Sequence, residues 1–459
     1  MESYDVLHSF RRSLYECFHR RADALFELSD SLLSADTFPS PVHLSLQASH
    51  QRGWGSFYAA LDRGRIDAEA LRGLLARHPL ATAEGEHPPV YAVDVSVWPR
   101  CDAECSPQRG YYYHPSRHSA GQPIVAGWAY QFIAQISFAR ESWSAPVDVA
   151  RVHPAENTNS FAARQVKALL ERLPGTKETP LFIFDAGYDP VGLQQGLEEE
   201  EEEEESACQI LVRLRAGRCF YGDPSLAEPP ARPGRPRRHG PKMKCSDPST
   251  WPESSAEYEC EDSGYGTVRV RAWADLHSKV GAHADRGSRG PLPIVVGTLI
   301  LVEVERLPRG ERRREPRVLW LWWHGPEGTD PDLGLIWRAY VRRFDIEHTF
   351  RFLKQTLGWA TPRVRHPEQA DRWTGLVMAA YTQLRLARAH VADRRLPWER
   401  RYDDPERLTP IRVHRVVSTL LAQLGTPAKP PKPCGRSPGR PKGRLSGRAK
   451  RYPAIKKSA

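Results

Sequence analysis

Apolar and polar positions along the first eighty residues follow helical spacing. Apolar side chains recur every three or four positions through residues 6–33, and shorter patterns of the same kind occupy residues 54–61 and 67–75. These patterns predict a small helical region ahead of the main fold. The basic residues of the first pattern are expected on its other, exposed faces; they are Arg11, Arg12, Arg20 and Arg21.

Two later apolar runs are nearly continuous instead of following helical spacing, and they resemble buried strands. The run VYAVDVSVW carries Asp94 in its middle, and PLFIFDAGYD places Asp185 directly after four apolar residues. Continuous β-branched and apolar runs are typical of central strands with both faces covered. A buried aspartate costs several kcal/mol unless it is paired or bound to a cation. Two such residues in one chain indicate a shared site.

A polar face on one helix supplies a third carboxylate. The stretch YVRRFDIEHTFRFLK fits the pattern Y-x2-R-x3-E-x6-K with Tyr340, Arg343, Glu347 and Lys354. At about 100° per residue these four side chains project from one narrow face of a single helix. The alternative is a surface helix with ordinary ion pairs at i,i+4 spacing. A second, apolar stripe is expected to pack on a sheet, and it consists of Ile346, Phe350, Leu353 and Leu357.

In this order, the two strand aspartates and the helix pattern resemble the DDE transposases of bacterial insertion sequences, over roughly residues 85–390. The resemblance implies an α/β fold with a ribonuclease H-like catalytic core. It also implies that Asp94, Asp185 and Glu347 hold two Mg²⁺ or Mn²⁺ ions, with Asp94 bridging them. Independently, hard divalent cations that act on phosphates prefer carboxylate oxygens. The residues expected at DNA phosphates are Tyr340, Arg343 and Lys354.

About 160 residues separate Asp185 from Glu347, far more than a connection needs. Strand-like runs occupy residues 209–214, 267–272, 294–304 and 317–323; the first is expected to be the last core strand, and the others a mostly β insertion at about 216–330. Similar transposases carry an insertion here that touches DNA. Arg235 and Arg237, in a basic string, are expected to contact DNA. Trp322 and Trp323 are candidates for base stacking; the alternative is that they fill a small β core.

Charge is concentrated at the C-terminus. The chain has a net charge of +10, and its last thirty-one residues contain many lysines and arginines and no acid. Frequent proline and glycine argue against a helix there, so residues 429–459 are expected to form a disordered basic tail. Within it, Arg440 and Lys442 belong to a Pro-Gly-Arg-Pro-Lys string that resembles a minor-groove hook. The alternative is a solubilising or non-specifically adhesive tail.

The eight cysteines show no regular framework, and the chain shows no signal peptide, which favours a reducing cytosol. A cytoplasmic, nucleoid-associated protein is therefore expected. One group has spacing close to a zinc pattern, and the alternative is a structured loop beside the active site; it consists of Cys101, Cys105, His114 and His118. The longest apolar stretch is too short to cross a bilayer.

Together these patterns predict four parts. Residues 1–84 form a helical DNA-binding domain, residues 85–395 the catalytic core with its insertion, residues 396–428 a helical segment, and residues 429–459 the tail. The predicted function is cleavage at transposon ends and joining of the 3′-hydroxyl to target DNA, by a homodimer on double-stranded DNA. The alternatives are a ribonuclease H-like nuclease without strand transfer, and an inactive transposase-derived DNA-binding protein.

Overall fold

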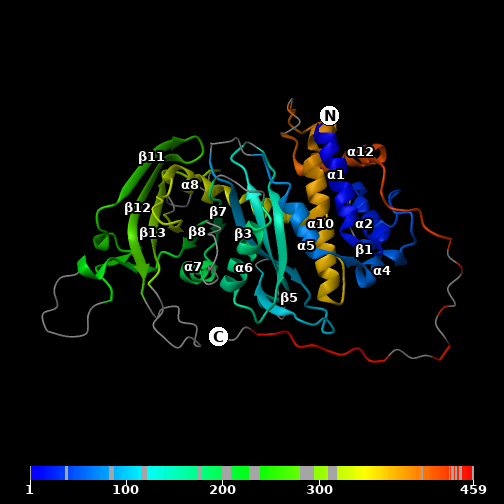
Figure 1. Cartoon of the computed structure of the whole chain (residues 1–459), viewed down its shortest axis with the longest axis horizontal. Coiled ribbons are helices and arrows are strands. Elements are labelled where there is room, and N and C mark those ends of the chain that lie inside the picture. Colours follow the sequence, from blue (N-terminus) through cyan, green and yellow to red (C-terminus); the bar gives the residue numbers. More distant parts are fainter. Residues whose placement is uncertain are drawn as a thin grey trace.

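The computed structural model describes most of the chain, as an elongated body with a large central sheet (Figure 1). The residues left undescribed are 1, 37–39, 82–86, 115–120, 140, 174–177, 199–207, 227–237, 280–293, 309–317, 403, 405–406, 434, 436–438, 440–441, 444–446 and 457–459.

Helices occupy the N-terminal region, as the apolar spacing predicts. They pack against the long helix α10 (Pro367–Ala387) and share one continuous core with it (Figure 1). The N-terminal region therefore covers one side of the central sheet. Its elements are α1 (Glu2–Glu16), β1 (Phe18–Arg20), α2 (Ala22–Ser34), α3 (Pro41–Leu44), α4 (Gly55–Arg63), β2 (Arg65–Ile66) and α5 (Ala68–Ala76).

The central part alternates strands and helices. Both predicted aspartate strands are present, and the expected last core strand has the predicted bounds. The elements are β3 (Val90–Pro99), β4 (Gly110–Tyr113), β5 (Ile124–Ile136), β6 (Ala145–Val152), α6 (Thr158–Leu170), β7 (Leu181–Phe184), α7 (Pro190–Glu198) and β8 (Gln209–Leu214).

The region of the expected insertion is mostly β. Its elements are β9 (Cys219–Tyr221), η1 (Pro224–Leu226), β10 (Lys242–Lys244), η2 (Pro248–Thr250), β11 (Ala256–Asp262), β12 (Gly266–Ser278), β13 (Val296–Val304) and β14 (Leu319–His324). Helices follow to the end of the compact body, and they are α8 (Leu333–Arg342), α9 (Asp345–Gln355), α10, η3 (Arg388–His390), α11 (Pro410–His414) and α12 (Val417–Leu424).

Among the described residues, twelve strands form one mixed sheet. Its order is β10-β9-β12-β13-β14-β8-β7-β3-β5-β4, with β11 beside β12 and β6 beside β5. Strands β3, β7 and β8 are parallel, whereas β5 runs antiparallel to β3 and β6 antiparallel to β5. The central order β6-β5-β3-β7-β8 is compatible with the expected ribonuclease H-like core.

Alternation along β3 explains why the sheet is covered on both faces. Val90 and Ala92 belong to the core shared with α9, α10 and the N-terminal helices. Tyr91 and Val93 point the other way, into a core with α6 and α7. Side chains in a strand point to alternate faces, so a central strand that is buried on both sides needs a continuous apolar run. Asp94 interrupts that run on the α9 side.

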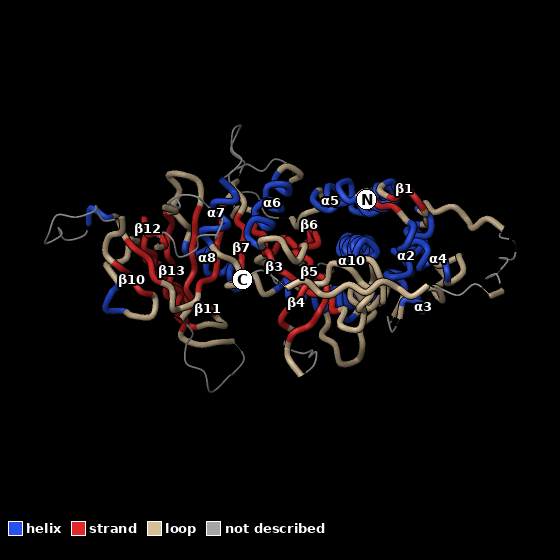
Figure 2. The backbone as a smooth tube through the Cα atoms, turned by 90° about the horizontal axis from the view of Figure 1, so that it is seen from below, coloured by secondary structure: helices blue, strands red, loops and turns tan. Residues whose placement is uncertain are grey.

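The β-rich region that follows β8 lengthens the central sheet. Strand β14 pairs antiparallel with the core strand β8, and β13 and β12 continue the ladder outward (Figure 2). Its apolar residues join the same two cores as the central strands. The β-rich region and the catalytic strands are therefore one hydrogen-bonded unit.

Both candidate stacking residues of β14, two of its three tryptophans, are buried in the core. Trp322 is buried and stacks on Phe220 with ring centroids 5.0 Å apart. Trp323 is also buried, and its indole N–H donates to Gln209 Oε1 at 3.1 Å. Burial of both rings contradicts the expected base stacking, because a base needs an exposed ring face. The alternative, that these residues fill a β core, agrees with the structure.

Contrary to expectation, Arg11 is not on an exposed face, since only 2% of the residue is accessible. Its guanidinium donates to both Asp30 carboxylate oxygens at 2.7 and 3.0 Å and to Gln383 Oε1 at 2.8 Å. Burial raises the pKa of Asp30, and Arg11 opposes that rise. Helices α2 and α10 therefore cover more of α1 than its apolar stripe. The ion pair with Asp30 links α1 to α2, and the hydrogen bond to Gln383 links α1 to α10.

We predict that Arg11→Met destabilises the protein by about 3–5 kcal/mol, because it leaves the Asp30 carboxylate buried without a counter-charge. Arg12→Ala is the control: this neighbouring arginine is exposed, so its loss should change stability by about 0.5 kcal/mol or less. Chemical denaturation of both variants measures the difference. Equal stability of the two variants would contradict the structural role of the pair.

Candidate active site

Strand register brings the two predicted aspartates level with each other. Strands β3 and β7 are parallel, with Ala92 beside Ile183. Continuing that register by two residues places Asp94 beside Asp185, at the carboxyl end of β7. Ligand sites in open α/β sheets commonly lie at the carboxyl ends of strands.

Backbone donors hold both carboxylates. Asp94 Oδ1 accepts the Val95 N–H at 2.7 Å, and Asp185 Oδ1 accepts the Gly187 N–H at 2.8 Å. A β-carbon at Gly187 would come within 2.9 Å of Asp185 Oδ1, so a side chain there would displace the carboxylate. The Asp-x-Gly turn therefore fixes the position of Asp185.

The predicted single helix is two helices. α8 ends at Arg342 and α9 begins at Asp345, so the expectation of one continuous helix is wrong at the joint. The Ile346 N–H bonds to Arg343 O at 3.2 Å, and the Glu347 N–H to Phe344 O at 3.0 Å. These are i→i+3 bonds, which tighten the turn locally. The four-residue pattern is therefore shared between two short helices.

Arg343, at this joint, lies between two of the carboxylates. Its Nη1 is 3.3 Å from Asp94 Oδ2, and its Nη2 is 3.9 Å from Glu347 Oε1. The Arg343 side chain is only 10% exposed, whereas that of Glu347 is 43% exposed. The guanidinium also lies over the Tyr340 ring, with Cζ 5.8 Å from the centroid. A cation–aromatic contact of this kind helps to orient the arginine.

Electrostatics couple all three carboxylates. The pKa of Asp94 is raised to about 6: burial is the main cause, the negative charges of Asp185 and Glu347 add to the rise, and Arg343 and the Val95 N–H oppose it. For Arg343 itself, burial lowers the pKa, but the same three carboxylates and Tyr340 outweigh burial and raise it. The site thus concentrates negative charge around one arginine.

Lys354 has a different setting. Its ammonium lies 5.9 Å from the centroid of the Phe350 ring and 5.7 Å from that of Trp359. The predicted apolar stripe of α9 is buried, as expected. The structure therefore gathers Asp94, Asp185, Glu347, Arg343 and Tyr340, and places the Lys354 ammonium over aromatic rings.

A buried polar chain supports the site, and the sequence patterns did not predict it. The Tyr188 hydroxyl donates to Gln131 Oε1 at 2.8 Å, and Gln131 Nε2 donates to Gln165 Oε1 at 2.8 Å. Burial raises the pKa of Tyr188, and the charges of Asp94 and Asp185 add to the rise. The chain ties the turn after β7 to β5 and α6. A glutamine inside the apolar run of β5 was the available signal.

The three carboxylates suit a divalent cation by their donor chemistry. Carboxylate oxygens are preferred ligands of Mg²⁺ and Mn²⁺, and the mutual repulsion seen at Asp94 is what such an ion would relieve. Among the described residues, no three His, Cys, Asp or Glu side chains are already arranged as a metal-binding group. Arg343 supplies the local positive charge in this arrangement.

The zinc pattern gains no support from the described part of the chain. Cys101 is exposed and its thiol faces the Ala126 carbonyl at 3.8 Å, while Cys105 is half-buried. His118 lies outside the described residues. Three of the predicted DNA contacts, Arg235, Arg237 and Arg440, also lie outside them, whereas Lys442 is described and exposed.

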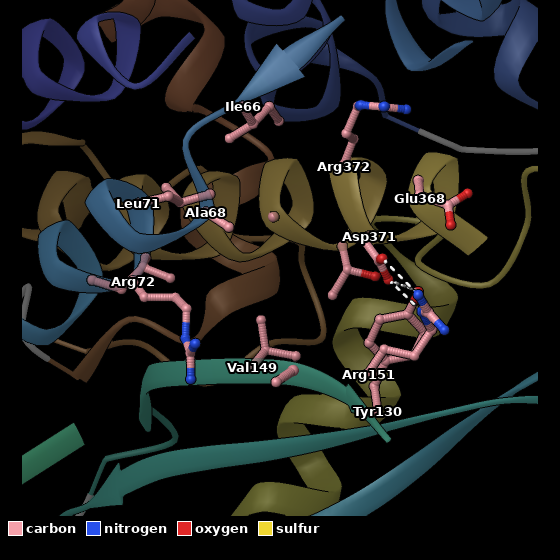
Figure 3. A pocket seen from close by; sticks show the side chains of 14 residues that line it. Ile66, Ala68, Leu71, Arg72, Tyr130, Val149, Arg151, Glu368, Asp371 and Arg372 are labelled. Carbon is pink, nitrogen blue, oxygen red and sulfur yellow. Dashed lines mark hydrogen bonds and ion pairs between the residues drawn. The ribbon is translucent and has the colours of Figure 1, made fainter. Parts of the chain in front are cut away.

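A separate cavity of about 370 Å³ lies between α5, β6 and α10 (Figure 3). The Arg151 guanidinium pairs with Asp371 at 2.9 and 3.2 Å, and the Tyr130 hydroxyl donates to the same carboxylate at 2.7 Å. Arg72 pairs with the buried Asp148 at 2.6 and 2.7 Å. Both arginines are thus neutralised by protein carboxylates, so the cavity has a structural character.

Residues 13–279 match the family described as DDE superfamily endonuclease, which is more than half of the chain. Asp94 and Asp185 lie inside the matched range, and Glu347 lies beyond it. No curated protein matches the chain significantly.

We predict that Arg343→Ala raises the pKa of Asp94 further above its value of about 6 in the metal-free protein. The arginine is the main group that favours the charged carboxylate, so its loss must favour the protonated form. Carbon-detected NMR titration of the Asp94 carboxyl measures the change. Arg342→Ala is the control, because Arg342 pairs with Asp345 instead; an equal shift in both variants would contradict the assignment.

Proposed function

We propose, since the chain belongs to the DDE superfamily endonuclease family, that it is a transposase that cleaves DNA at transposon ends and joins the freed 3′-hydroxyl to target DNA. The observation that carries the proposal is the convergence of Asp94, Asp185 and Glu347 around Arg343. The family indicates a nuclease or transposase with DNA as its substrate, and divalent metal ions are general in it.

In this proposal the three carboxylates hold two Mg²⁺ or Mn²⁺ ions. Bound there, the ions would supply Lewis acidity for attack by water or a 3′-hydroxyl on a phosphodiester and for departure of the opposite oxygen. The protein contributes position. Gly187 and the Tyr188 hydrogen-bond chain fix Asp185, and the β3 backbone fixes Asp94. No side-chain nucleophile is required.

Arg343 has two roles in the proposal. Without DNA it balances the charge of Asp94 and Glu347. With DNA present it is placed to bind a phosphate beside the carboxylates, together with the Tyr340 hydroxyl. Charge-assisted contacts to phosphate position a strand without reading its sequence.

The strand-transfer step separates this function from its main alternative. The matched family is described by its endonuclease activity, which favours a nuclease as the second candidate. Incubation with end DNA, a target plasmid and Mg²⁺ or Mn²⁺ distinguishes the two. Joined products support the transposase, and cleaved ends without joining support the nuclease. We further propose a homodimer that holds two transposon ends.

The helical N-terminal region and the β insertion are proposed as DNA-binding parts. Within the part of the chain that the structure describes, no helix is long and apolar enough to span a membrane.

We predict that Asp94→Asn, Asp185→Asn and Glu347→Gln each reduce cleavage by at least about a thousandfold, because each removes a charged metal ligand while keeping its shape. DNA binding should stay largely intact, since metal ligation and phosphate contacts are separate tasks. Single-turnover cleavage and gel-shift assays on the same variants measure both. Glu171→Gln, an exposed carboxylate on the end of α6, should behave as the parent. Normal cutting by Asp185→Asn would remove it from the triad.

A second prediction concerns Lys354. If its ammonium leaves the aromatic rings to bind a phosphate, Lys354→Ala should slow cleavage about tenfold or more, since a charge-assisted contact contributes roughly 1.5–3 kcal/mol. If it only packs, Lys354→Met should preserve the rate and the melting temperature. Single-turnover rates and thermal melts of both variants decide. Parental rates in both would assign Lys354 to packing alone.

A further inference from the structure

A groove of about 380 Å³ lies between α4 and the segment that leads into α10. Helix α4 packs beside the first turns of α10, where the rings of Phe57 and Trp373 are 5.6 Å apart (Figure 1). Three arginines line this groove: Arg63 at the end of α4, and Arg363 and Arg365 in the segment before α10. We call it the arginine groove. Its described lining holds one carboxylate, that of Asp62, so positive charge predominates.

The arginines of the groove face solvent. The Arg63 side chain is 62% exposed, and its Nε lies 3.5 Å from Asp62 Oδ2. The Arg363 side chain is 85% exposed, and its Nη1 lies 4.0 Å from Asp102 Oδ2. Arg365 is exposed as well. Exposed ion pairs contribute little to stability, and each guanidinium has five N–H donors. The groove therefore has donors available for an anion from outside.

Hydrogen bonds fix the shape of the groove. Gln369 Oε1 accepts the N–H groups of Arg365 and His366, both at 2.9 Å, and Gln369 Nε2 donates to Asp62 Oδ1 at 3.0 Å. One amide thus ties the segment before α10 to α4. Arg365 Nε donates to the Cys105 carbonyl at 3.4 Å. Because these bonds order the groove before a ligand arrives, binding costs less conformational entropy.

The loop behind the groove, residues 100–110, is also held in place. Only 4% of Arg109 is accessible, and its guanidinium donates to the carbonyls of Ser106 at 3.0 Å and Tyr452 at 2.8 Å. The Tyr452 N–H donates to the Glu104 carbonyl at 2.8 Å. This part of the tail, which was expected to be disordered, thus has a defined place. It supports the loop that contacts the groove arginines.

Two elements lead from the carboxylates to the groove. On α9, Glu347 and Lys354 are seven residues apart, which is about 10 Å along a helix axis. The Lys354 ammonium lies 5.7 Å from the centroid of the Trp359 ring, and the groove segment begins four residues after that ring. On β3, Trp98 follows Asp94 and its ring packs on Trp359 with centroids 5.9 Å apart. The groove therefore lies outside the carboxylate site and is joined to it through α9 and β3.

We propose that the arginine groove binds phosphates of a DNA duplex outside the carboxylate site, and so positions the duplex without taking part in its cleavage. Guanidinium groups suit phosphate because they offer parallel N–H donors and a permanent charge. Three exposed guanidiniums from two elements suit a chain of phosphates. Tyr58, 37% exposed and part of the same lining, adds a hydroxyl donor. The identity of the anion as DNA rests on the proposed function, whereas the preference for an anion rests on the arginines alone.

The test measures binding of a duplex of about 30 base pairs to the full chain without divalent metal. The triple variant Arg63→Gln/Arg363→Gln/Arg365→Gln should bind about tenfold or more weakly, and its slope of log K against log[salt] should be shallower by about 0.9 for each lost phosphate contact. Replacing the same three arginines by lysine keeps the charges and should keep most of the slope. Parental affinity and slope in the glutamine variant would overturn the proposal.

Arg164→Gln is the matched control for Arg63→Gln. Arg164 lies on α6, its side chain is 63% exposed, and it pairs with Glu156 as Arg63 pairs with Asp62. The control should keep the parental affinity, slope and melting temperature, and Arg63→Gln should lose affinity at an unchanged melting temperature. Equal losses in the two variants would overturn the proposal, because they would show a general effect of charge. Since no metal is present, the result does not depend on whether the protein joins DNA strands.

Discussion

Crowding of negative charge around Asp94 in the middle of β3 and Asp185 at the end of β7 is the constraint on which the site depends. Asp94 is buried beside a second carboxylate in register with it and within the field of a third. Such a group must either take up a proton or lie next to a cation. In the structure Arg343 is that cation, and it lies at the tight turn between α8 and α9. The contact between Arg343 and Asp94 thus joins the α8–α9 turn to strand β3 and balances part of the charge of the site.

The spacing of apolar residues along the chain predicted those strands and helix faces whose burial depends on neighbouring residues. The strands of Asp94 and Asp185 were found because a lone carboxylate stands out in a run that is buried on both faces. The apolar stripe of α9 was found for a similar reason, since helical periodicity shows which side faces a core. The strand order at the centre is compatible with the core that the resemblance implied, whereas the apolar pattern predicted no order.

Features that depend on distant partners could not be predicted in the same way. Arg343, at the break between α8 and α9, contacts Asp94, some 250 positions earlier in the chain, and spacing along one helix does not show such a partner. Arg11 is charged in sequence but buried in space, because Asp30 and Gln383 enclose it. Near the C-terminus, the backbone N–H groups of Tyr452 and Ile455 donate to the carbonyls of Glu104 and Arg109, and no local pattern shows these partners. Trp322 and Trp323 were candidates for base stacking but are buried, since aromatic residues suited to binding are equally suited to filling a core.

One hydrogen-bonded sheet links the β-rich region to the strands that carry Asp94 and Asp185. From β12 through β13, β14 and β8, each strand is bonded to the next until β7, which ends one residue before Asp185. A sheet of this kind is stiff along its ladder of bonds. A displacement of β12 would therefore be transmitted through four strand pairings to the turn after β7, which holds Asp185. The position of the Asp185 carboxylate is therefore coupled mechanically to the β-rich region, which lies far from it in the sequence.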